Sequence, residues 1–92
     1  MKMDNILIIK LVTGDELITN LEKDEKENFT ILNKPLAMIM HPDGHMGLHH
    51  EWMGGDGMNP DTFVKIRTDA IIAEVDPPET LIKRYKNLLD IE

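Results

Sequence analysis

The sequence has no cysteine among its 92 residues. Disulfide bridges and thiolate metal sites therefore cannot contribute to its stability. A chain of this length forms one domain, over residues 1–92, and buries only about two thirds of the surface that its unfolded state exposes. Its own core is small, so we expect oligomerisation to supply further stability.

Long apolar runs are also missing. Residues 6–12 are apolar except for Lys10, and this stretch is far shorter than the roughly 20 residues that cross a bilayer. It lacks the basic flank and the small-residue cleavage site of a signal peptide. We therefore expect a soluble, cytoplasmic protein without a membrane partner, and the absence of cysteine agrees with that location.

Basic residues are in short supply. The chain has 17 acidic and 10 basic side chains, which give a formal net charge of −7. This charge repels a phosphate backbone at long range, and an assembly of identical subunits multiplies the repulsion. Any nucleic-acid site on this protein must therefore be a local basic patch.

Catalytic patterns are absent as well. The serine-like nucleophiles are six threonines, and none lies within a nucleophile motif. No glycine-rich loop leads from a strand into a helix, where it would hold a phosphate. We therefore expect that the protein is not an enzyme and binds no cofactor.

Short strand patterns fill most of the chain. Runs of β-branched and apolar residues predict five strands, at 6–13, 16–23, 29–41, 62–67 and 70–75. Gly14 suits a tight turn after the first strand. In the second strand Leu17 and Leu21 share one face, and Ile18 lies on the other. Pro35 predicts a bend or bulge in the third strand, where a small barrel would turn a corner.

Two polar segments connect these strands. The run 23–28 is polar throughout and is either a solvated hairpin tip or a recognition loop. Residues 42–61 contain five glycines and two prolines, which predict a long variable loop around a short extended piece near 48–53.

The C-terminal segment predicts a helix at about 78–90. Asp76 can cap it, Pro77 suits the first helical position, and Glu79 can close a capping box. One apolar stripe follows the predicted helix: Leu81, Ile82, Tyr85, Leu88 and Leu89. The stripe must cover either the open end of the barrel or a neighbouring subunit.

Three segments carry a resemblance to a known family. Their sequences are KLVTGDEL at 10–17, NFTI at 28–31 and VKIRTDAI at 64–71. They resemble the two motifs of the Sm-like family, and the chain is similar in plan to the small Sm-like proteins of bacteriophages of marine cyanobacteria. The resemblance spans about residues 6–76. It implies a mainly β fold: a five-stranded, strongly bent antiparallel barrel of the SH3-like kind, here with a C-terminal α-helix.

The resemblance also implies an RNA site. Asn28 matches the motif asparagine that hydrogen-bonds a uracil edge, and Arg67 matches the arginine that completes the pocket. Lys26 in the same loop is the third candidate RNA contact. The sequence departs from the family where Lys26 and Glu27 replace a stacking side chain. The alternative is that Asn28 is a turn residue and Arg67 pairs with a nearby acid.

The sequence also departs from the family in the two residues that follow the arginine. The family has glycine and asparagine there, whereas this chain has Thr68 and Asp69. The RNA pocket is therefore at best half present.

The long loop is rich in histidine and methionine. Imidazoles with carboxylates can bind zinc or nickel, and His45 and His49 are the pair that we would test. No spacing typical of a zinc site appears, so no metal ligand is assigned. Trp52 in this loop is either a stacking platform, a subunit-contact residue or an anchor that holds the loop to the body.

We therefore expect a ring-forming Sm-like protein that binds single-stranded RNA or assists its processing, with no DNA partner. Edge strands of adjacent subunits would pair, and Trp52, Ile71 and Ile72 are the candidate interface residues. The alternative is an oligomeric protein–protein scaffold without a nucleic-acid role, which the acidic charge favours. Metal binding by the His/Met-rich loop is the third function considered.

Overall fold

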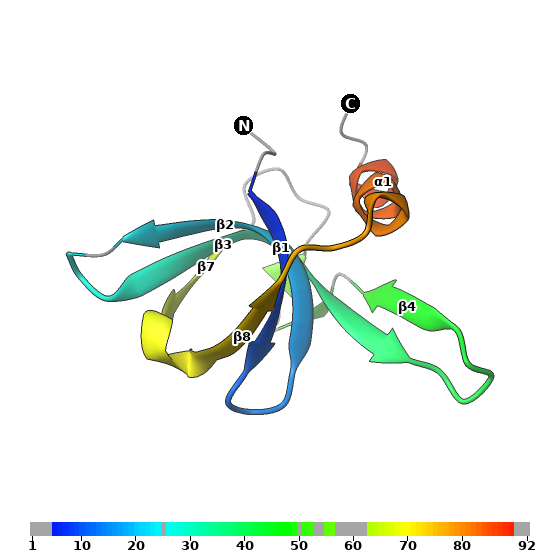
Figure 1. The fold of residues 1–92 in the computed structure, drawn as a ribbon, viewed down its shortest axis with the longest axis horizontal. Coiled ribbons are helices and arrows are strands. Elements are labelled where there is room, and N and C mark those ends of the chain that lie inside the picture. Colours follow the sequence, from blue (N-terminus) through cyan, green and yellow to red (C-terminus); the bar gives the residue numbers. More distant parts are fainter. Residues whose placement is uncertain (1–4, 25, 50, 53–54, 57–62, 90–92) are drawn as a thin grey trace.

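The computed structural model describes residues 5–24, 26–49, 51–52, 55–56 and 63–89. The chain forms a mainly β structure with one helix near its C-terminus (Figure 1). The elements are β1 (Ile6–Leu11), β2 (Glu16–Asp24), β3 (Phe29–Met40), β4 (Met46–His49), β5 (Glu51–Trp52), β6 (Gly55–Asp56), β7 (Phe63–Arg67), a 3₁₀ turn (Thr68–Ala70), β8 (Ile71–Val75) and α1 (Glu79–Leu88).

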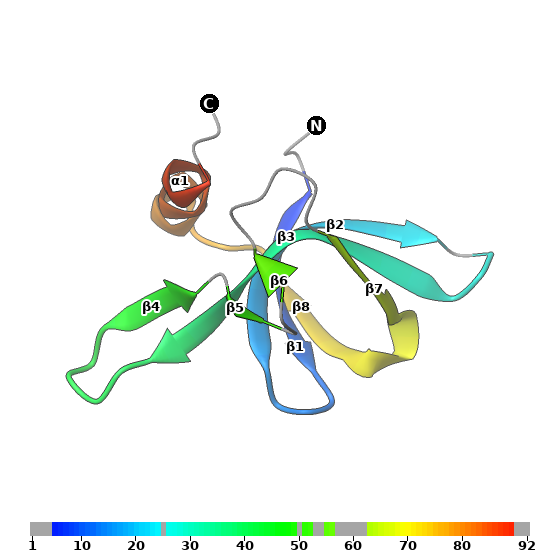
Figure 2. The same cartoon turned by 180° about the vertical axis from the view of Figure 1, so that it is seen from behind.

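The strands form an antiparallel sheet in the order β4-β3-β2-β1-β8. The strand β7 also pairs with β3, along the half that β4 leaves open. His49 of β4 lies opposite Ala37, and Phe63 of β7 lies opposite Asn33. β4 and β7 therefore follow the same edge of β3, one after the other, as two parts of an interrupted strand. Within the part of the chain that the structure describes, the short strands β5 and β6 pair with each other and not with the larger sheet (Figure 2).

A bulge at Lys34 and Pro35 bends β3. The register with β2 shifts there, because Ile18 lies opposite Leu36 whereas Asn20 lies opposite Asn33. One extra residue on β3 is the signature of a β-bulge, which bends its strand. Lys34 has a φ of 50°, in the left-handed region that few residues other than glycine adopt. The bend predicted from the proline is confirmed.

Alternating side chains divide the sheet into two apolar faces. One buried cluster lies inside the bent sheet and contains Ile9, Leu11, Leu17, Leu21 and Leu32. The other lies under the helix and contains Ile6, Ile18, Leu36, Tyr85 and Leu89. The predicted placement of Leu17 and Leu21 on one face and of Ile18 on the other is confirmed. Because side chains alternate along β1 and β2, each of these strands contributes residues to both clusters.

The helix α1 covers its own sheet. Its apolar stripe packs on the second cluster, with Leu81 and Ile82 at the margin. The predicted start was wrong in detail: Pro78 is the N-cap residue, no side chain caps the helix, and Glu79 is its first residue. Pro77 precedes another proline, which disfavours a helical conformation for it. Neither Asp76 nor Pro77 is therefore part of the helix.

The long loop expected at 42–61 contains more structure than predicted. Residues 46–49 pair with β3, so the extended piece begins before the predicted position at 48. The 3₁₀ turn occupies 68–70, so the last strand begins at 71 rather than 70. No helix within the described residues is long and apolar enough to cross a membrane.

Candidate functional site

The β2–β3 hairpin tip holds two of the three candidate RNA residues. The side-chain Oδ1 of Asp24 accepts hydrogen bonds from the backbone N–H groups of Lys26, at 3.1 Å, and Glu27, at 3.3 Å. Asn28 follows with a φ of 59°, a conformation that asparagine tolerates better than most residues. Asn28 is therefore a turn residue at the end of the hairpin tip.

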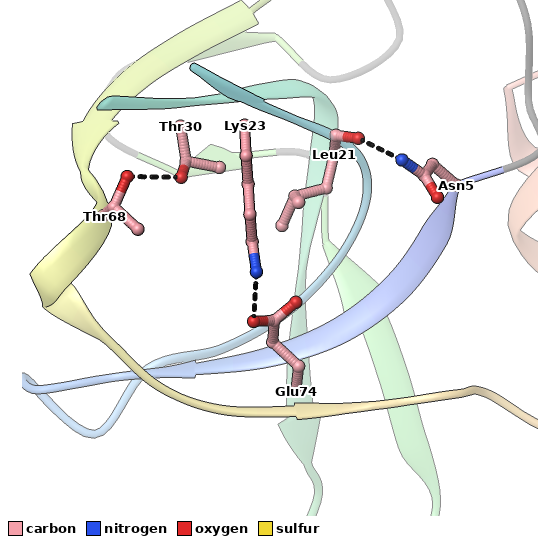
Figure 3. Close-up of polar contacts among 6 residues, drawn as sticks. All are labelled: Asn5, Leu21, Lys23, Thr30, Thr68 and Glu74. Carbon is pink, nitrogen blue, oxygen red and sulfur yellow. Dashed lines mark hydrogen bonds and ion pairs between the residues drawn. The ribbon is translucent and has the colours of Figure 1, made fainter. Parts of the chain in front are cut away.

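The end of β7 brings the third candidate to the same place. Arg67 lies opposite Phe29 in the β3–β7 ladder. The backbone N–H of Thr68 donates to the Asn28 carbonyl at 2.8 Å, and the hydroxyls of Thr30 and Thr68 are 2.9 Å apart (Figure 3). The hairpin tip with Asn28 and the end of β7 with Arg67 are thus joined through Thr68 by backbone and side-chain hydrogen bonds.

The basic side chains of this end already have acidic neighbours. Arg67 Nη2 lies 3.1 Å from Asp69 Oδ2, with both side chains more than two-thirds exposed. Lys65 Nζ lies 3.6 Å from Glu27 Oε2 and 4.6 Å from the centre of the Phe29 ring. Pairs this exposed are weak, so a phosphate group could compete for either cation.

A third ion pair closes this end of the sheet. Lys23 at the end of β2 reaches Glu74 of β8 at 2.7 Å, although the two strands are not neighbours (Figure 3). An open depression of about 510 Å³ lies beside the hairpin, and Lys26 is the one RNA candidate that lines it. Its other lining residues are Glu22, Lys23, Asp24 and Ile31.

The candidate interface residues differ in exposure. Ile71 lies opposite Leu11 and packs on the inner cluster, whereas Ile72 is 58% exposed on β8. Val75, further along the same strand, is 57% exposed. Within the described residues β8 pairs with β1 alone, so its second edge is open. Trp52 is partly buried against the inner cluster, which matches the anchoring role considered for it.

The histidines pair differently from the pair singled out in the sequence. His49 lies beside His41, with 3.2 Å between their Nε2 atoms. His45 instead places Nδ1 3.1 Å from Oδ2 of Asp43. Hydrogen bonds from His45, first from its backbone N–H, lower the pKa of Asp43. Among the described residues no three histidine or carboxylate side chains gather as a metal site.

No family model matches the chain, and no curated protein sequence matches it.

Proposed function

We propose that this chain is a small barrel of the Sm-like type, which assembles through its sheet edges and binds single-stranded RNA at the hairpin end. The strand order, the bulge in β3 and the 3₁₀ turn before the last strand support the barrel. One observation carries the RNA site. Asn28 and Arg67 are far apart in the sequence, and the hydrogen bond from the backbone N–H of Thr68 to the carbonyl of Asn28 holds them at the same end of the molecule.

The chemistry of these side chains suits an unpaired nucleotide. An amide can read the edge of a base, and a guanidinium can stack on it or contact its phosphate. Lys26 adds a positive charge beside the depression. The loop has Lys26 and Glu27 where an aromatic ring would stack, and Lys65 covers the ring of Phe29. We therefore expect weak binding that depends strongly on salt.

Titration of a labelled uridine-rich oligonucleotide at low salt tests the proposal. The informative variant must remove the amide and preserve the turn. Asn28→Gly does both, because glycine adopts a positive φ without strain. Asn28→Gly and Arg67→Ala should each weaken binding by about 1–3 kcal/mol, the range for loss of one base contact. Fluorescence anisotropy measures the affinity.

A matched control separates the local contact from total charge. Arg84→Ala removes the same charge from the exposed face of α1. It should change the affinity far less than Arg67→Ala. A third variant, Asp69→Asn, should have the opposite effect. It removes the acid that pairs with Arg67 and should strengthen binding. Absence of binding at low salt, or equal losses from Arg67→Ala and Arg84→Ala, would contradict the RNA site.

Assembly is the second part of the proposal. The open edge of β8 exposes Ile72 and Val75, and an unpaired apolar edge is suited to pairing with another chain. The edge formed by β4 and β7 is the complementary partner, and repeated pairing of the two edges closes a ring. Light scattering should give several times the monomer mass. A monomer at all concentrations would contradict the assembly.

The second candidate is an oligomeric scaffold without a nucleic-acid role. The net charge of −7 favours it, as do the acidic partners that Lys65 and Arg67 already have. An oligomer that binds no RNA at low salt would support the scaffold.

A further inference from the structure

The β3–β4 hairpin lies at the opposite side of the molecule from the β2–β3 hairpin (Figures 1 and 2). Its turn is closed by backbone hydrogen bonds between His41 and His45 and from Gly44 to His41. The ladder pairs Ile39 with Gly47 and Ala37 with His49. Because side chains alternate along strands, His41, Gly47 and His49 lie on one face of this hairpin.

We propose that His41 and His49 form a site for a divalent transition-metal ion such as Zn²⁺. Their Nε2 atoms lie 3.2 Å apart and the ring centres 5.3 Å apart, so each ring presents this nitrogen to the other. Zinc binds imidazole nitrogen at about 2.0–2.1 Å, which places two ligands of a tetrahedral ion about 3.3 Å apart. Both rings therefore reach one ion with only small rotations.

Gly47 makes the approach of the two rings feasible. A Cβ atom at this position would lie 2.5 Å from Nε2 of His41 and 2.7 Å from Nε2 of His49. A side chain at this position would force both imidazole rings to move from their present places. Gly47 has no positive φ that would itself require glycine. The absent side chain thus serves the histidine pair rather than a turn.

Proton chemistry explains why an ion would prefer this pair. Two neutral Nε2 lone pairs cannot face each other at 3.2 Å without a proton between them. Metal binding requires the donating ring to change tautomer: its proton moves from Nε2 to its own Nδ1, and both Nε2 lone pairs then bind the ion. Two protein ligands leave positions for water, so the affinity is lower than that of a four-ligand structural site.

Titration of the full, untagged chain with Zn²⁺ tests the site, with calorimetry for the affinity and imidazole NMR signals for the ligands. Wild-type protein should show zinc-dependent shifts at His41 and His49, with binding that weakens at lower pH as protons compete. His41→Ala and His49→Ala should each lower the affinity at least about tenfold, since loss of even an outer-shell partner costs that much.

Two further variants decide between this pair and the loop in general. His45→Ala is the matched control, because His45 faces Asp43, and it should leave the affinity unchanged. Gly47→Ala keeps both imidazoles and should still lose binding. Mg²⁺, which prefers oxygen ligands, should produce no shifts. Equal binding by the His41→Ala/His49→Ala double variant, or an equal loss in His45→Ala, would overturn the proposal.

Discussion

Tyr85 links α1 to the bulge of β3 through its hydroxyl. The group donates to the carbonyl of Lys34 at 2.8 Å and lies 3.2 Å from that of Asn33, and the side chain is fully buried. The bulge interrupts the strand ladder, so these carbonyls need donors from elsewhere. Thr19 supplies one, with its hydroxyl 2.8 Å from the Asn33 carbonyl.

Removal of this hydroxyl should therefore be costly. Tyr85→Phe keeps the ring within the cluster but leaves the Lys34 carbonyl without this donor. We expect a loss of about 1–3 kcal/mol in the free energy of unfolding, the cost of an unsatisfied buried acceptor. Urea denaturation measures it, with Leu88→Ala on the exposed side of the helix as the control. A loss no larger than that of the control would show that the hydroxyl is not needed.

The same hydroxyl makes stability depend on alkaline pH. Burial raises the pKa of Tyr85 well above its ordinary value near 10. Above pH about 10 the unfolded chain releases this proton while the folded chain keeps it, so stability falls as pH rises. The slope of unfolding free energy between pH 9 and about 11 should therefore be steeper in wild type than in Tyr85→Phe. Lysines titrate in both proteins, so equal slopes would argue against the buried phenol.

Single residues differ in how far the sequence predicts them. The faces of Leu17, Leu21 and Ile18 follow from the period of a strand, which needs no knowledge of neighbours. The pair of His41 and His49 depends on the register of the β3–β4 hairpin, which the turn signal at Pro42, Asp43 and Gly44 does not set by itself. His45 and His49 are four residues apart and would share a face on a helix or on a strand, so their spacing does not show that the partner of His49 is His41.

At the scale of elements, the helix and the strand face beneath it form one packed unit. Leu36 is 1% exposed and contacts the cluster beneath α1, whereas Leu88 on the helix is 38% exposed. Leu36→Ala should lower stability by about 2–5 kcal/mol, because it removes apolar contacts and leaves a cavity. Leu88→Ala should cost well under half as much in the same denaturation experiment. Similar losses would mean that α1 does not dock as described.

The elements themselves were predictable where composition and period agreed. The first three strands and the bend at Pro35 follow from β-branched runs and from a proline that cannot continue a ladder. The strand at Met46–His49 was harder to predict, because Gly44 and Gly47 suggested an irregular loop. Its pairing with the end of β3 and the packing of Leu48 on the cluster beneath α1 stabilise it, and both are tertiary contacts.

At the scale of the whole molecule, charge and exposed apolar edges oppose each other. A net charge of −7 disfavours close approach of identical chains at low salt. Ile39, Met40, Ile72 and Val75 nevertheless remain largely exposed, and burial of such surface contributes about 25 cal/mol per Å². Salt at about 0.1 M screens the charge repulsion beyond about 10 Å and leaves the apolar contribution intact. Association should therefore strengthen with salt, opposite to RNA binding.

Thermal stability should report this association. If folded chains associate and unfolded chains do not, the melting temperature rises with protein concentration. Ile72→Lys places a charge on the open edge of β8 and should remove that dependence and lower the mass. Val12→Lys is the matched control, since Val12 is also apolar and 62% exposed but follows β1 at its turn. Calorimetric scans over a hundredfold concentration range measure the effect, and a wild-type melting temperature independent of concentration would contradict assembly through this edge.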